Sequence, residues 1–379
     1  MIDALLQSLF NNHLFAGLLY LFLFMLLVQL VYFWAFFSQL AFRKSGVENP
    51  EKPPVSVILV ASNHYNDLRK HLPEILSQDY PNYEVVVVND ASEDGSDELL
   101  ERFAEQYPHL KVVVMHQSLN WFKGTKFPLS IGIKSAKNEI ILVTETNFVP
   151  LSNKWLSEMM KCRKDKTEII VAHSTFATGS KINAWYRFAG FYRQLLNFSA
   201  ILTKLTFTGS ASNLIFTRSL FYDNQGFTSH YTKSTGTGEM FVNQAATRSN
   251  VSLQISSESR MAFAKNLAFG KWLEKENDNF EIHRYLKFSH RAFNSLFFNS
   301  LLLFFLAFAA LMILNLHWEI ILGLFALRFI SQLLVFGFAQ KKLSEKGLLL
   351  FTPLFEIFLH LVHFFLRFRL LFDRKKIWN

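Results

Sequence analysis

The sequence predicts an α/β protein with a mostly parallel sheet, helices on both faces of that sheet, and additional transmembrane helices. Two observations lead to this class. Between roughly residues 50 and 290, short apolar runs alternate with amphipathic segments, the pattern of strands joined by covering helices. Outside that region lie four long apolar runs, and 50% of the 379 residues are hydrophobic, more than a soluble domain ordinarily carries.

The first apolar run, residues 14–38, has no charged side chain and exceeds the roughly 20 residues needed to cross a bilayer. No basic segment precedes it and no small-residue cleavage site follows, so we expect a retained anchor within residues 1–45 rather than a signal peptide. The other three runs lie at 296–316, 318–339 and about 348–366. They predict C-terminal transmembrane helices and a basic tail within residues 294–379.

The charges that flank these runs predict the orientation. Arg43 and Lys44 follow the first run, while Lys287 and Arg291 precede the second. The positive-inside rule therefore places the central region in the cytoplasm of a multi-pass protein of the inner (cytoplasmic) membrane. A fourth complete crossing would put the basic tail outside, so we expect the last apolar segment to be re-entrant or interfacial.

Three ionisable residues lie near one helical face of that last segment: Glu356, His360 and His363. Such residues face a partner helix or water rather than lipid. They are expected to serve helix packing or, alternatively, a proton relay.

The central region is expected to contain five strands, at 56–61, 83–89, 111–116, 139–145 and 168–174. Apolar residues at helical spacing follow the first three strands, within 67–77, 95–106 and 124–137. Right-handed crossovers would assemble these units into one sheet, and ligands of such sheets bind beyond the carboxyl ends of the strands. The polar residues directly after each strand are therefore the candidate site residues.

Three loops supply those candidates: Ser62–His64, Asn89–Asp94 and Glu145–Asn147. Asp90 could accept hydrogen bonds from a base or a ribose, whereas Ser92 and Asp94 are expected to cap the helix that follows. Glu145 and Asn147 come where a metal-bound diphosphate would need two carboxylates.

The composition excludes other classes of protein. The single cysteine, Cys162, excludes an internal disulfide and fits a reducing compartment. The net charge of +9 is concentrated beside the apolar runs, where it suits membrane lipids. No basic-aromatic motif accompanies it, so no nucleic-acid partner is expected.

The segments VSVILVASN, QDYPNYEVVVVNDASEDGS and TETNFVPLSNKWL resemble family 2 glycosyltransferases with the GT-A fold, over about residues 54–260. The resemblance implies a glycosyltransferase-like domain at 46–265 that takes a nucleotide sugar. It implies that Asp90 reads the nucleotide base, with Lys126 as a basic residue of the same site. Asn63, which follows the first strand, is the third nucleotide-binding candidate.

This chain departs from the family pattern at the metal motif. Family members end the fourth strand in Asp-x-Asp, which holds a divalent cation on the donor diphosphate, whereas this chain has Glu145-Thr146-Asn147. One carboxylate remains and a neutral amide replaces the other, so a hard cation loses a charged oxygen ligand. We therefore expect Mg²⁺ or Mn²⁺ to bind weakly through Glu145 and Asn147, or not at all.

A second departure concerns the general base. The stretch STGTGEMFVNQ resembles the acidic segment that supplies it, but Thr237 and Gly238 stand in place of acids. Glu239 remains as the candidate base, or alternatively as a helix-start residue.

The third departure lies at 266–293, where we expect amphipathic interfacial helices. Trp272, Phe280 and Tyr285 are expected to rest on the membrane surface. The run from Glu274 to Asn279 offers little that could pair with a diphosphate.

These features and the resemblance predict a membrane-bound glycosyltransferase of family 2 type, and the resemblance implies that it is an inverting enzyme of hexosyltransferase type. Its acceptor would be lipid-linked or membrane-proximal. The alternative is a catalytically inactive, glycosyltransferase-like subunit that scaffolds a membrane complex with a membrane-protein partner.

Overall fold

The computed structural model describes residues 12–44, 49–115, 124–176, 184–265, 268–345 and 347–372. They divide into two compact units. The sheet unit lies within Lys44–Gly190 and Ala200–Lys287. The helical unit lies within Met1–Arg43, Phe191–Ser199 and Phe288–Asn379.

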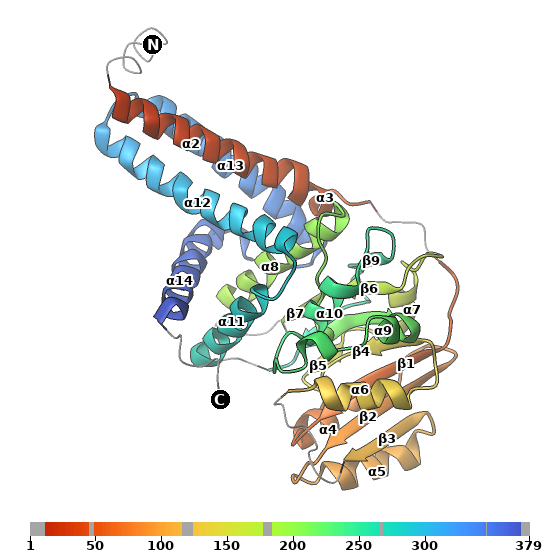
Figure 1. Ribbon diagram of the computed structural model, residues 1–379. Coiled ribbons are helices and arrows are strands. Elements are labelled where there is room, and N and C mark those ends of the chain that lie inside the picture. The colour runs from red at the N-terminus through yellow and green to blue at the C-terminus, as the bar shows by residue number, and fades with distance from the viewer. Residues whose placement is uncertain are drawn as a thin grey trace. The chain divides into compact units, whose positions relative to one another are not determined.

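A seven-stranded sheet in the order β3-β2-β1-β4-β8-β6-β9 forms the centre of the sheet unit (Figure 1). Its strands are β1 (Val55–Ala61), β2 (Tyr83–Asp90), β3 (Leu110–Met115), β4 (Ile140–Val143), β6 (Ile169–Ala172), β8 (Leu214–Thr217) and β9 (Val251–Gln254). The pairs β1–β2, β2–β3, β1–β4 and β6–β9 are parallel, and β8 is antiparallel to both β4 and β6. The prediction of a mostly parallel sheet is confirmed.

Helices cover both faces of this sheet. On one face lie α4 (Tyr65–Leu76), α5 (Ser96–Gln106) and α7 (Trp155–Met160), and on the other lie α6 (Lys126–Ser135) and α10 (Thr237–Ala245). Side chains alternate between the faces of a strand, so Val57 and Leu59 of β1 join the core beneath α4 and α5, while Ile58 faces α6. Each fully buried side chain of this kind stabilises the fold by about 1.5–3 kcal/mol.

A second, three-stranded sheet begins directly after the turn at Glu145–Asn147. It consists of β5 (Phe148–Pro150), β10 (Met261–Phe263) and β7 (Ser174–Phe176), with β10 between the other two. β10 is antiparallel to β5, and Phe263 pairs with Phe148. This pairing brings the residues after β10 beside the turn that follows β4.

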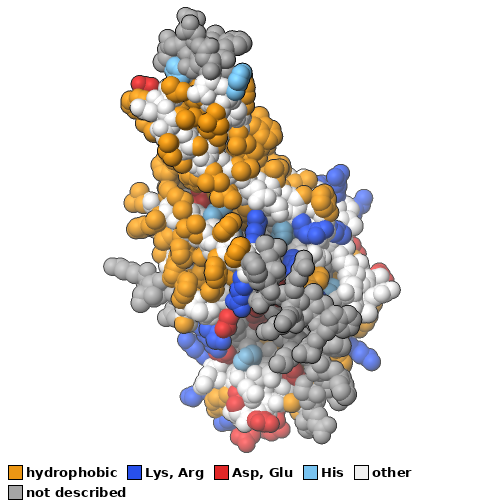
Figure 2. Space-filling model, turned by 60° about the vertical axis from the view of Figure 1, so that its left-hand side comes forward, with side chains coloured by type: hydrophobic (Ala, Val, Ile, Leu, Met, Phe, Trp, Pro, Cys, Tyr) orange, Lys and Arg blue, Asp and Glu red, His pale blue; other side chains and the backbone are white. Residues whose placement is uncertain are grey.

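In the described part of the chain, four helical segments are long and apolar enough to cross a membrane: His13–Ala41, Phe288–Leu314, Trp318–Lys342 and Leu349–Arg369. They contain α2 (His13–Val31), α12 (Phe288–Leu314), α13 (Trp318–Lys342) and most of α14 (Thr352–Phe372). Figure 2 shows hydrophobic side chains gathered over the surface of these helices. α14 is one continuous helix, and its re-entrant or interfacial placement stays a prediction.

A buried ion pair crosses the interior of the helical unit. The Arg328 guanidinium of α13 donates to a carboxylate oxygen of Glu356 on α14 at 3.1 Å, and both side chains are fully buried. Arg328 also donates to the side-chain oxygens of Gln29 and Gln332, and the Tyr192 hydroxyl donates to Glu356 at 2.8 Å. The prediction that Glu356 faces a partner helix rather than lipid is confirmed.

Candidate active site

The loops after β1 and β2 are joined by hydrogen bonds at the carboxyl edge of the sheet. Asn63 adopts a left-handed backbone with φ of 55°, its N–H donates to the Ser92 hydroxyl at 3.0 Å, and its side-chain oxygen accepts from the Glu93 N–H at 2.8 Å. Asp90 ends β2, and its carbonyl accepts from the Ser62 hydroxyl at 3.0 Å. Hydrogen bonds therefore hold the loop that contains Asn63 against the loop that begins at Asp90.

Asp94 connects the starts of α4 and α5. Its carboxylate accepts from the Tyr65 N–H at 2.7 Å and from the Ser96 N–H at 3.2 Å. Burial raises its pKa, but these hydrogen bonds and one from the Ser96 hydroxyl outweigh that effect and lower the pKa overall. The predicted capping role of Asp94 is confirmed, whereas that of Ser92 is wrong because the Ser92 hydroxyl bonds Asn63 and Asn89.

The turn after β4 presents Glu145 and Asn147, both half-buried. Between them, the Thr146 hydroxyl lies 3.0 Å from Nδ1 of His64, and the Thr146 carbonyl accepts from the His71 ring at 2.9 Å. Among the described residues, the buried side-chain oxygen of Asn147 has no hydrogen-bond partner. The turn is thus fixed at its centre and has an unsatisfied acceptor on one side.

These residues do not fit a resident divalent cation. Among the described residues, no group of three His, Cys, Asp or Glu side chains is placed to hold a metal ion. Burial raises the pKa of the Glu145 carboxyl, and the ammonium of Lys275 lowers it in part. A hard cation prefers several charged oxygen ligands, and this turn offers one carboxylate that already interacts with a lysine.

Lys126, at the start of α6, is 2% exposed. Its ammonium donates to the carbonyls of Lys233 and Thr235, so it fixes the loop that leads into α10. Burial lowers its pKa to about 8, against the opposing effect of the Glu239 carboxylate. Lys126 and Glu239, predicted from distant parts of the sequence, therefore interact. A direct role of Lys126 in nucleotide binding stays a prediction.

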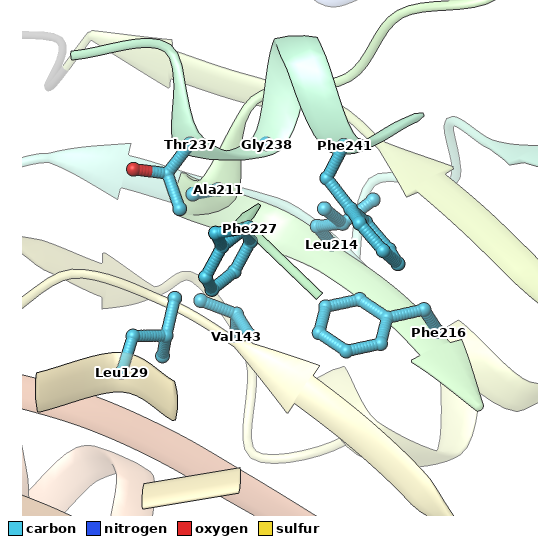
Figure 3. A pocket seen from close by; sticks show the side chains of 9 residues that line it. All are labelled: Leu129, Val143, Ala211, Leu214, Phe216, Phe227, Thr237, Gly238 and Phe241. Atoms are coloured by element: carbon cyan, nitrogen blue, oxygen red, sulfur yellow. The ribbon is translucent and has the colours of Figure 1, made fainter. Parts of the chain in front are cut away.

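Glu239 lies half-buried in the first turn of α10, and its neighbour Gly238 explains why an acid is missing there. A Cβ at Gly238 would come within 2.4 Å of the Ala211 nitrogen and 2.6 Å of the Gly209 carbonyl oxygen. Beneath this point, Figure 3 shows Leu129, Val143, Phe227 and other apolar side chains crowded against the helix start. In this turn, Gly238 is therefore closed to any side chain.

Helix α11 (Phe269–His283) contacts both parts of the candidate site. Near its carboxyl end, Ile282 packs against Met240 of α10, and the N–H of Lys287 donates to the Asn243 side chain at 2.7 Å. Nearer its start, the ammonium of Lys275 lies 4.8 Å from the centre of the Phe263 ring, beside the Glu145 turn.

One expectation about this segment is corrected. Trp272 is 2% exposed and stacks on Trp185 and Tyr186, so it does not rest on a membrane surface, because these rings bury it within the sheet unit. The run Glu274–Asn279 contains Lys275 beside the turn, and the expectation that this run offers little to a diphosphate stays a prediction. The position of Lys275 over the turn depends on the packing of α11. In the sequence, only the positive charge of Lys275 could have identified it as a candidate.

Comparison with known proteins agrees with this arrangement. The sequence model of glycosyl transferase family 2 matches residues 56–223, which span all but the first residue of β1 through β8 and include the turn at Glu145. This part of the chain, less than half of its length, is similar to glycosyl transferase family 2.

Among curated proteins, this chain is 25% identical over 128 residues to "Putative glycosyltransferase EpsH" of Bacillus subtilis (strain 168). It is 29% identical over 102 residues to "Probable glycosyltransferase YdaM" of the same strain. These alignments cover 32% and 26% of the chain and only 34% and 24% of the two relatives.

Among solved structures, the mannosyltransferase PcManGT from Pyrobaculum calidifontis, in complex with GDP-Man and Mn²⁺, has a TM-score of 0.59 with this chain at 17% identity. The match covers 88% of this chain and 99% of PcManGT. At this identity the likeness shows the GT-A fold, which confirms the predicted fold class. The roles of Asn63, Asp90, Lys126 and Glu239 stay predictions.

Proposed function

We propose that this chain transfers a sugar from a nucleotide-sugar donor to a lipid-linked or membrane-proximal acceptor. The observation that carries the proposal is a domain similar to glycosyl transferase family 2 whose candidate donor residues follow strands at the carboxyl edge of its sheet. The complex of PcManGT, a protein of the same fold, with GDP-Man supports a nucleotide-sugar donor.

In the proposed reaction, Asp90 binds the nucleotide and Glu239 acts as the base. Glu239 takes the proton from the acceptor hydroxyl while the acceptor oxygen bonds to the anomeric carbon of the sugar. The bond from that carbon to the diphosphate breaks, and the nucleoside diphosphate leaves with the bonding electrons. Attack from the face opposite the leaving group gives inversion. The electrostatic attraction between the Lys126 ammonium and Glu239 favours the charged form of the carboxylate that can accept a proton.

A divalent cation would have Glu145 and Asn147 as its protein ligands and would stabilise negative charge on the leaving diphosphate. Because that donor set is poor, no step of the proposed reaction depends on the cation. The free side-chain oxygen of Asn147 is instead suited to accept a hydroxyl hydrogen from the donor sugar.

The four long apolar helices support membrane association, and hence an acceptor at or in the bilayer. We propose that the sheet unit lies on the cytoplasmic side of the inner membrane, where nucleotide sugars are made. Arg43 and Lys44, next to the first apolar helix, and Lys287, before α12, support this orientation.

The test is calorimetric titration of the detergent-purified full chain with UDP and with GDP. We expect one of the two to bind, and we expect Asp90→Asn to weaken binding by about tenfold or more, because a carboxylate acceptor is lost. The matched control is Asp165→Asn, which removes an exposed carboxylate after α7 and should bind as the unchanged chain does. If neither UDP nor GDP bound to the chain, the result would contradict the proposal and favour the inactive scaffold.

A further inference from the structure

We propose that Lys275 of α11 is the cation that neutralises the donor diphosphate at the turn after β4, in place of a divalent metal ion, and that Glu145 positions it. This inference rests on the proposed function, because it concerns the same donor. In this proposal, Glu145 positions a lysine side chain and does not bind a metal ion.

The geometry that places Lys275 comes from two connected contacts. Its ammonium lies 4.8 Å from the centre of the Phe263 ring at the end of β10. Phe263 pairs with Phe148, the first residue of β5, and the next N–H, that of Ala264, donates to the Asn147 carbonyl at 3.0 Å. The lysine side chain is exposed and lies over the strand end that adjoins the Glu145–Asn147 turn, where its ammonium can reach a ligand that occupies the turn.

The charges at the turn favour a single cation of charge +1. Lys275 interacts electrostatically with the Glu145 carboxylate and with Asp278 of its own helix. Before a donor binds, a divalent ion held by Glu145 would lie close to the positive charge of Lys275, at a cost in Coulomb energy. The replacement of a second carboxylate by Asn147 is thus matched by a lysine on a different element.

Other lysines around the sheet edge have different partners. Lys265 pairs with Asp67 at 2.6 Å, and Lys271 pairs with Glu274 at 3.0 Å within α11. Lys126 donates to two carbonyls of the loop before α10. Lys275 differs from all three in its electrostatic interaction with the Glu145 carboxylate.

The test is calorimetric titration of the detergent-purified full chain with UDP and GDP, once in EDTA and once in Mn²⁺. The unchanged chain should bind one nucleotide in EDTA, and Mn²⁺ should change the affinity by less than about threefold. Lys275→Met should weaken that binding about 10-fold to 100-fold, the range of a lost charge-assisted hydrogen bond. Lys271→Met removes the same charge from the same helix and should have no effect.

Two further variants separate a direct role of Lys275 from a loss of structure. Lys275→Arg keeps the positive charge and should restore most of the binding that Lys275→Met loses. Glu145→Gln should still bind nucleotide in EDTA, because the lysine remains, but more weakly than the unchanged chain, because the carboxylate that positions the lysine is lost. Binding that appears only with Mn²⁺ and is lost in Glu145→Gln but not in Lys275→Met would overturn the inference while leaving the proposed function intact. Failure of the unchanged chain to bind under either condition would overturn both.

Discussion

Single residues at the turn after β4 decide which chemistry the site can support. Glu145 keeps one carboxylate, Asn147 supplies a neutral oxygen, and Lys275 approaches from α11. The sequence identifies the first two because they follow a strand directly. It does not identify Lys275, because the electrostatic interaction between residues 130 positions apart depends on how α11 packs.

Gly238 gives a prediction at the scale of one residue. Gly238→Ala places a Cβ within 2.4 Å of the backbone nitrogen of Ala211, so either α10 or the Gly209–Ala211 segment must move. We expect a loss of about 1–3 kcal/mol in the free energy of unfolding, measured as a lower thermal midpoint of the purified chain.

The matched control is Gly270→Ala in α11, where a Cβ would meet no atom within 4 Å. This variant should unfold at the same temperature as the unchanged chain or slightly above it, because alanine favours helix. Equal midpoints for the two variants would contradict the close approach at Gly238.

At the scale of elements, the apolar runs and their spacing predict the parallel strands well. The observed β1, β2 and β3 agree with the expected strands within one residue at each end. What could not be foreseen is β8, which inserts antiparallel between β4 and β6. Its run Leu214–Thr217 is only four residues long, and its neighbours are set by long-range pairing rather than by local sequence.

The contact between α13 and α14 gives a prediction at the same scale. Glu356→Ala leaves the Arg328 guanidinium buried without its carboxylate, which costs about 3–5 kcal/mol. Replacing both partners, as Arg328→Met with Glu356→Leu, removes both buried charges and should cost much less than Glu356→Ala alone. Thermal unfolding of the detergent-purified variants measures the difference.

Glu319→Ala is the control for that series, because Glu319 is an exposed acid in the first turn of the same α13. It should change the midpoint little. If the double variant were less stable than Glu356→Ala, the ion pair itself, rather than the stranded charge, would be what stabilises the two helices.

At the scale of the whole molecule, we assign sugar transfer to the sheet unit and membrane association to the helical unit. The sheet unit carries all the candidate donor and base residues, while the helical unit carries the four helices long enough to cross a membrane that the described residues contain. Composition predicts those helices because a long apolar run without charged residues is most stable as a helix across a lipid bilayer. The predicted boundaries after residues 45, 265 and 293 stay predictions.

Release of nucleoside diphosphate from a nucleotide sugar by the purified full chain tests the central claim most directly. The assay supplies UDP- and GDP-sugars with and without membrane lipid extract, and compares the unchanged chain with Glu239→Gln and with the exposed-acid control Glu105→Gln. We predict release that increases with lipid, persists in Glu105→Gln and falls at least 100-fold in Glu239→Gln, as loss of a general base requires. Release that never exceeds that of Glu239→Gln with any donor would contradict the account.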